Sequence, residues 1–417
     1  MHKTTFILPI FAVLVITMAA VIPVQAAKDK GSAYQTGFAR WRSADSGFAS
    51  WTLEAGVQTD ASGALVMDLS TALQDTDLYA PGAYNGGNYY NGGSFLVGQA
   101  TGPIVTTAFA FTEAIASWNA VTPPNTWIEV DIRARFGTRW TKDYILGIWA
   151  SDYSTIQRHS VNLQGDADGY VAVDTLVLSA KKQNADAFQL VVKLFSADGS
   201  STPALSNIST AFSTTPLKNA SASQGNSANW GTLLNVPECS QMVYPDGGEV
   251  WCSPTSTSMV LSFWQQYSGL CEPQVRAAVD GVFDWIYDGH GNWPFNTAYA
   301  ATQSAFGDSA LLEGYVARFA SLAQAEPWVK AGVPVIVSFA WGKGDLTGAA
   351  VSSSNGHLAV LVGFDANGNP IINDPAAASD AEVQRTYLRS EFEPLWLTSS
   401  GGTVYLIYPV GWAVPEL

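Results

Sequence analysis

One cysteine, Cys252, stands where the chain could begin a helix with a reactive thiol. Ser253 and Pro254 follow it and favour a first helical turn, and the run Met259–Trp264 continues as a buried helix would. A thiol at a helix N-terminus lies near the positive end of the helix dipole and near unpaired backbone N–H groups. Both favour the thiolate, which is the nucleophilic form. The segment therefore predicts covalent catalysis, and the alternative is a buried structural cysteine.

Two polar residues on later strands could serve this thiol. His357 stands at the mouth of a buried strand, and Asp374 follows the next short strand, just before Pro375. A hairpin of this size can bring the two side chains together. The imidazole would then take the thiol proton and protonate the leaving group, while Asp374 orients the ring. The alternatives are a strand-edge histidine bonded to a backbone carbonyl and an Asx turn. All three residue types in this chain order favour a Cys-His-Asp site.

The elements that must position these residues belong to the second half of the chain, over 234–417. Helices are expected over 273–286 and 297–306, and strands over 333–339, 357–364 and 403–408. A helical part followed by strands is typical of an α+β domain.

Residues 34–217 show the period of strands and almost none of helices. In the clearest strand, 127–136, apolar side chains from Ile128 onward face one way and Glu129, Asp131, Arg133 and Arg135 face the other, as in a half-buried antiparallel strand. Further strands are expected over 93–98, 144–150, 170–179 and 188–194. Turn residues between them predict an all-β sandwich that is jelly-roll-like. The Ser- and Asn-rich segment 218–233 is interpreted as a flexible linker.

A loop rich in glycine, asparagine and tyrosine, 81–93, could present aromatic rings to a sugar. The alternative is a turn with packed aromatic side chains. A cell-wall or polysaccharide ligand of the first domain is therefore a candidate partner.

The start of the chain has the pattern of a targeting segment. A short basic start is followed by an apolar stretch, 6–24, and by small residues at Val24 and Ala26. This predicts a cleaved signal peptide over 1–26 and a secreted or periplasmic protein, and the alternative is a membrane anchor. No stable membrane span is expected after signal removal. The net charge of −15 disfavours nucleic acid and anionic membranes as partners.

The chain has three cysteines, and an odd number in an exported protein suggests one disulfide and one free thiol. If Cys252 is the nucleophile, Cys239 and Cys271 remain to form the disulfide. The alternative is three free thiols. With only four histidines there is no convincing metal cluster, so neither a metal nor an organic cofactor is expected.

With these motifs in place, the second domain resembles the family-39 cysteine peptidases, the double-glycine or bacteriocin-processing type within the papain-like superfamily. The resemblance rests on Val236-Pro237, Ser240-Gln241, Trp251–Ser256, Gly291–Tyr299, Gly356–Val360 and Asn373–Pro375. It implies a papain-like α+β fold with Cys252 as nucleophile, His357 as base and Asp374 as the orienting residue. It also implies that Gln241 donates to the oxyanion. Trp251, Trp293 and Phe295 are candidate substrate-binding residues.

The expected function is that of a secreted cysteine peptidase, acting on a peptide or protein through a thioester. The resembling peptidases are domains of exporters that cut leader peptides after Gly-Gly. This chain shows no transporter segment, so that preference is not carried over. Two alternatives stay open: a papain-like amidase or acyltransferase acting on cell-wall peptide, and a polysaccharide-binding protein with a weak or inactive peptidase module.

Overall fold

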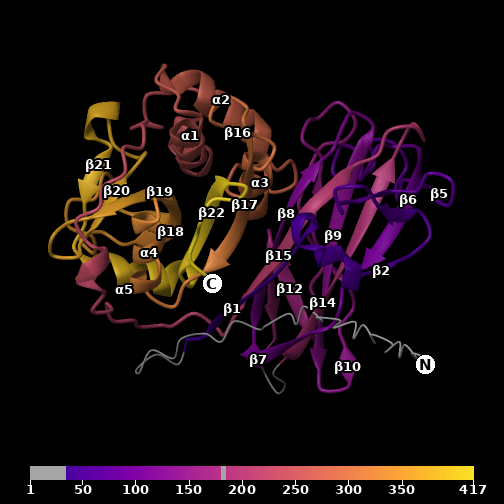
Figure 1. The fold of residues 1–417 in the computed structure, drawn as a ribbon, viewed down its shortest axis with the longest axis horizontal. Helices are drawn as coiled ribbons and strands as arrows, with labels where there is room; N and C mark the ends of the chain where they lie inside the picture. Colours follow the sequence, from indigo (N-terminus) through magenta and orange to yellow (C-terminus); the bar gives the residue numbers. More distant parts are fainter. Residues whose placement is uncertain (1–33, 180–184) are drawn as a thin grey trace, which may run out of the picture.

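The computed structural model describes residues 34–179 and 185–417, so the predicted signal peptide lies outside the described residues. Figure 1 shows two domains side by side, the first built from strands and the second from strands and helices. Within the described ranges, no helix has the length and apolar character needed to cross a bilayer.

The first domain consists of two antiparallel sheets whose apolar faces share one core. The first sheet has the order β12 (Gly169–Ala172), β13 (Thr175–Leu178), β8 (Glu113–Val121), β15 (Ala204–Ser213), β4 (Leu65–Met67) and β3 (Val57–Thr59), and β1 (Thr36–Arg42) also pairs with β15. The second has the order β10 (Arg139–Trp140), β9 (Thr126–Phe136), β14 (Ala185–Ser196), β6 (Ser94–Thr101) and β2 (Thr52–Leu53), with β11 (Tyr144–Trp149), β5 (Leu73–Thr76) and β7 (Val105–Phe111) paired at its sides. The predicted β-rich character is confirmed, while the jelly-roll connectivity stays a prediction.

Two details of the predicted strands are wrong. The expected strand 170–179 is a hairpin, β12 and β13, that turns at Val173 and Asp174. Glu129 and Asp131 of β9 do not face solvent, because both are buried and bind Lys193 Nζ at 2.5 and 3.0 Å. The ion pair replaces part of the hydration that these carboxylates lose.

The tyrosines of the 81–93 loop belong to the core. Tyr84, Tyr89 and Tyr90 are all buried and pack edge-on against one another. The Tyr90 hydroxyl donates to Glu129 at 2.6 Å, so the loop covers the carboxylates of β9. The sugar-stacking prediction is wrong for these three rings, because packed rings cannot present a face to a ligand.

The second domain is one antiparallel sheet with helices. The sheet has the order β16 (Ser304–Ala305), β17 (Ala310–Arg318), β22 (Thr403–Pro409), β18 (Val335–Trp341), β19 (Ser354–Phe364), β20 (Pro370–Asn373) and β21 (Gln384–Thr386). The helices are α1 (Cys252–Gln265), α2 (Cys271–Val282), α3 (Trp293–Ala300), α4 (Glu326–Lys330) and α5 (Arg389–Ser400). Helix α1 packs on β19 and α5 on β18. Helix α3 begins four residues before the predicted 297, because Asn292 caps it and Pro294 suits its first turn.

The segment 218–233 is not a free linker. Buried Glu393 accepts from Ser223 N at 2.9 Å, and buried Glu326 accepts from Asn226 N at 2.8 Å. Arg389 lies between the two carboxylates, 2.7 Å from Glu326 and 3.3 Å from Glu393. The composition suggested flexibility, but these long-range bonds hold the backbone in place.

The two domains meet where β17 and α3 lie against β8 and β15 (Figure 1). Arg318 of β17 binds Glu113 of β8 at 2.5 Å and Ser213 Oγ at 2.6 Å. The interface therefore combines a buried ion pair with apolar packing.

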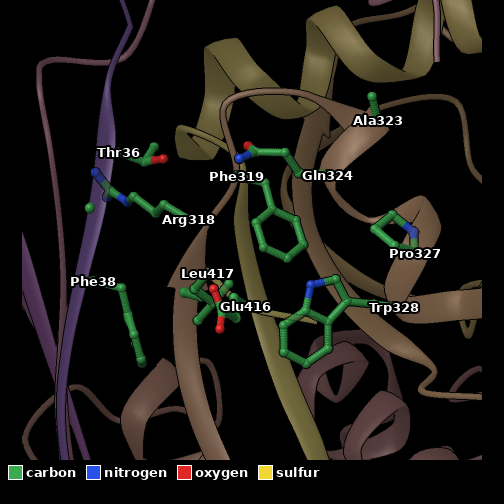
Figure 2. Close-up of a pocket in the computed structure, with 12 residues that line it drawn as sticks. Thr36, Phe38, Arg318, Phe319, Ala323, Gln324, Pro327, Trp328, Glu416 and Leu417 are labelled. Carbon is green, nitrogen blue, oxygen red and sulfur yellow. The ribbon is translucent and has the colours of Figure 1, made fainter. Parts of the chain in front are cut away.

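A cavity of about 260 Å³ lies at this interface, beside the C-terminal residue. Figure 2 shows the rings of Phe319 and Trp328 beside Leu417, with Phe38 and Arg318 on the opposite wall. None of the candidate catalytic residues lines this cavity, so it belongs to the domain interface.

Candidate active site

Cys252 is the first residue of α1, so its side chain lies at the helix N-terminus. The thiol hydrogen-bonds to His357 and to the backbone N–H groups of Ser253 and Leu358. Burial raises the pKa of Cys252, but these bonds and the charge of His357 outweigh burial and lower it below its ordinary value. Ser256 Oγ donates to the Leu358 carbonyl at 3.0 Å, which fixes α1 against β19 and sets the nucleophile beside the histidine.

His357 lies on β19 and joins the thiol to Asp374, the residue that follows β20. Its Nε2 is 2.7 Å from Asp374 Oδ1, which leaves Nδ1 to face Cys252. Phe339 and Trp341 pack edge-on against the imidazole, with ring centroids 5.5 and 5.4 Å away. Burial lowers the pKa of His357, but Asp374 and Cys252 together raise it to about 10. The arrangement favours a thiolate–imidazolium pair.

Asp374 has a further partner that the sequence does not reveal. Tyr387 is fully buried, and its hydroxyl donates to Asp374 Oδ2 at 2.6 Å. Ala376 N donates to the other oxygen at 2.9 Å. Burial raises the pKa of Asp374, but His357, Tyr387 and Ala376 outweigh it and lower that pKa. Tyr387 therefore holds the carboxylate charged and directed at His357, and no motif marks it because it simply follows the edge strand β21.

If the site carries out the peptide hydrolysis expected from the sequence, Tyr387→Phe should lower its rate about tenfold, because Oδ2 of the buried carboxylate loses its partner. The same loss should lower the free energy of unfolding by about 1–3 kcal/mol. Steady-state rates and urea unfolding measure the two effects. Tyr315→Phe is the matched control, since the Tyr315 hydroxyl contacts Tyr408 and no candidate catalytic residue. Equal activity in the two variants would contradict a role for Tyr387 at the site.

Gln241 contacts both the segment that follows Asp374 and the turn that leads to Cys252. Its backbone N–H donates to Pro375 O at 2.8 Å, and its Nε2 donates to Gly248 O at 2.7 Å, in the turn that leads to Cys252. This bond uses one of the two N–H groups of the amide, so the predicted contact with an oxyanion depends on the second. The Oε1 atom is buried and has no hydrogen-bond partner among the residues that the structure describes.

The three aromatic residues predicted to bind substrate differ in how far they are buried. Phe295 is fully buried and packs against Trp149 of the first domain at 5.2 Å, so its prediction is wrong: it is a core residue of the interface. Trp251 is also buried, between Tyr244 and His290, and supports the turn before Cys252. Trp293 is half-buried and stays a candidate.

The two other cysteines form a disulfide, Cys239–Cys271, with a Cα–Cα distance of 5.7 Å. It ties the segment before Gln241 to the start of α2. Cys252 is the free thiol.

Comparisons with known proteins match each of the two domains to a described family. Residues 31–213 match the family described as "Peptidase C39 N-terminal domain", and residues 233–404 match the family described as "Peptidase_C39 like family". No curated protein matches the chain. Among solved structures, a family two carbohydrate esterase from Cellvibrio japonicus shares 11% identity, with a TM-score of 0.19. That match covers 66% of this chain and 62% of the esterase chain, and its low score carries no argument. On the two family matches, which lie side by side along the sequence, the chain belongs to the family-39-like peptidases.

Proposed function

We propose that this protein is a secreted cysteine peptidase that hydrolyses peptide bonds through a thioester. The observation that carries the proposal is the chain of contacts from Cys252 at the start of α1, through His357, to Asp374. Membership in the peptidase family supports it. The helix α1 on an antiparallel sheet supports a papain-like fold for the second domain.

The chemistry follows from these contacts. The Cys252 thiolate attacks the carbonyl carbon, and the C=O electron pair moves onto oxygen. The backbone N–H of Cys252 and the second N–H of Gln241 donate to this oxyanion. His357 gives its proton to the leaving nitrogen as the C–N bond breaks, which leaves a thioester. Water, deprotonated by His357, then attacks the thioester, and the C–S bond breaks to restore the thiolate.

The disulfide Cys239–Cys271 supports the proposal that the protein works outside the cytoplasm. Disulfides persist in oxidising compartments and are rare in the cytosol. The predicted signal peptide points to the same location.

Mass spectrometry of the products tests the proposed function. We expect new peptides from casein with the wild-type protein and none with Cys252→Ala. Purified peptidoglycan is the second substrate, with free stem-peptide amines as the readout. Release from peptidoglycan without any cut in casein would replace the peptidase with a cell-wall amidase, and no product from either substrate would refute both.

A further inference from the structure

The first domain contacts one segment of the second, residues 283–293, which joins the end of α2 to the first residue of α3. Tyr153 Oη donates to Phe283 O at 2.5 Å, and Ser160 N donates to Asp284 Oδ1 at 3.0 Å. The Trp285 backbone N–H donates to Arg158 O at 3.2 Å, and its ring packs against Tyr84 and His159. At the far end, Asp174 Oδ2 accepts from the backbone N–H of Trp293 at 2.7 Å. Contacts from the first domain therefore hold both ends of the segment.

The same segment faces the turn that carries the nucleophile. The His290 ring packs edge-on against Trp251, with centroids 6.2 Å apart, and the Asn296 amide holds the His290 carbonyl at 2.8 Å. Tyr287 is about half exposed, at 47%. Burial is the main cause that raises the pKa of Tyr287, and the negative charges of Asp174 and Cys252 add to it. The Tyr287 hydroxyl is therefore close enough to both groups to interact with their charges.

Asp174 reaches the segment on a strained turn. The hairpin β12–β13 closes with two residues, and Asp174 N donates to Ala172 O at 2.7 Å across Val173. Val173 has a φ of 60°, in the left-handed region that a β-branched residue rarely adopts. Such strain persists where the surrounding structure holds it, and here it accompanies a buried carboxylate. Thr175 Oγ1 bonds the second oxygen of Asp174 at 2.9 Å.

We propose that the first domain is a positioning domain of the active site, in which Asp174 holds the 283–293 segment against the Trp251–Cys252 turn. The segment then presents Tyr287 and Trp293 to a bound peptide. Asp174 is a positioning residue, since its contacts are to Trp293 N and Thr175 and not to the thiol. The proposal rests on the proposed peptidase function for its substrate. The clamp, by which we mean the contacts of Asp174 and Tyr153 with the 283–293 segment, can be measured without a substrate.

Hydrogen exchange of the whole protein tests the clamp directly. In Asp174→Ala, we expect the amides of 283–293 to exchange at least tenfold faster, while those of 254–265 in α1 stay as in the wild type. Asp174→Asn keeps an acceptor oxygen for Trp293 N–H and should stay within twofold of the wild type. Asp168→Ala is the matched control, because this acid precedes the same hairpin but pairs with Arg139 inside the first domain. If Asp174→Ala does not fold, Tyr153→Phe removes the Phe283 contact and should speed the same exchange.

Hydrolysis of resorufin-labelled casein then shows whether the clamp serves the site. For Asp174→Ala, KM should rise at least fivefold, with kcat and the rate of Cys252 alkylation by iodoacetamide within twofold of the wild type. Unchanged exchange in 283–293, or faster exchange with an unchanged KM, would overturn the inference. Equal losses in the Asn and Ala variants would also overturn it, because the Asn side chain still accepts from Trp293. A wild-type protein that neither reacts with iodoacetamide nor cuts casein would refute the peptidase instead.

Discussion

At pH 6, iodoacetamide should alkylate the wild-type protein at a single site, Cys252, and His357→Ala should react on the order of 100-fold more slowly. An ordinary thiol has a pKa of about 8.5 and is almost entirely protonated at this pH. In the wild type, His357 helps to lower the pKa of Cys252, and the pKa of His357 is itself raised to about 10, so the pair favours thiolate and imidazolium. Between pH 6 and 9 the labelling rate of the wild type should therefore rise less than the rate of an ordinary thiol does. In His357→Ala it should rise over this range, as for a free thiol. Intact-mass spectrometry measures both rates.

The controls separate the nucleophile from its surroundings. Cys252→Ala should not label at all, because Cys239 and Cys271 are joined in a disulfide. His290→Ala removes a nearby imidazole that contacts Trp251, and it should label like the wild type. Equal rates for His357→Ala and the wild type would show that the histidine does not activate the thiol. Slow labelling of the wild type would rule out an activated nucleophile.

Arg389→Met should lower the free energy of unfolding by about 3–5 kcal/mol, since it removes the cation from two buried carboxylates. Glu326 and Glu393 are both fully buried, and Arg389 contacts each of them. Without it, desolvation of the carboxylates has no compensating charge, and the segment 218–233 loses its anchor. Urea unfolding at pH 7 measures the change.

The pH dependence of this loss has a defined sign. Burial raises the pKa of Glu393, so the folded state holds that proton more tightly than the unfolded state, and stability falls as the pH rises through the raised value. The difference between Arg389→Met and the wild type should thus be largest above that pKa and should shrink on acidification. Arg276→Met, which removes an exposed cation from Asp246 and Glu272, is the control and should change stability little. A similar loss in the two variants, or one that grows at low pH, would contradict the account.

The candidate catalytic residues could be proposed from the sequence because each is marked by the few residues next to it. A cysteine before a helix and a histidine at the start of a buried strand each imply an orientation, and Asp374 follows one short strand later. The structure adds the atoms that are used, with Nε2 of His357 toward Asp374. Gln241 was harder, since its role depends on which of its N–H groups is free once Gly248 O has taken one.

The errors share one physical origin, which is packing between segments far apart in the chain. Phe295 lies next to a motif of the site, yet it points into the first domain. Glu129 alternates with apolar residues as a solvent-facing position would, yet Tyr90 and Lys193 cover it. Periodicity reports which side chains share a face of a strand, but it does not report what covers the other face.

The sequence by itself determined the two-part organisation, the β-rich first domain and the residue types of the site, because strand period, helix-start chemistry and motif order are properties of short segments. Only the tertiary structure decided that Tyr387 supports Asp374, that Cys239 pairs with Cys271, and that Asp174 binds Trp293. Those contacts join residues 13, 32 and 119 positions apart. They depend on how whole sheets and helices pack, which no local pattern encodes.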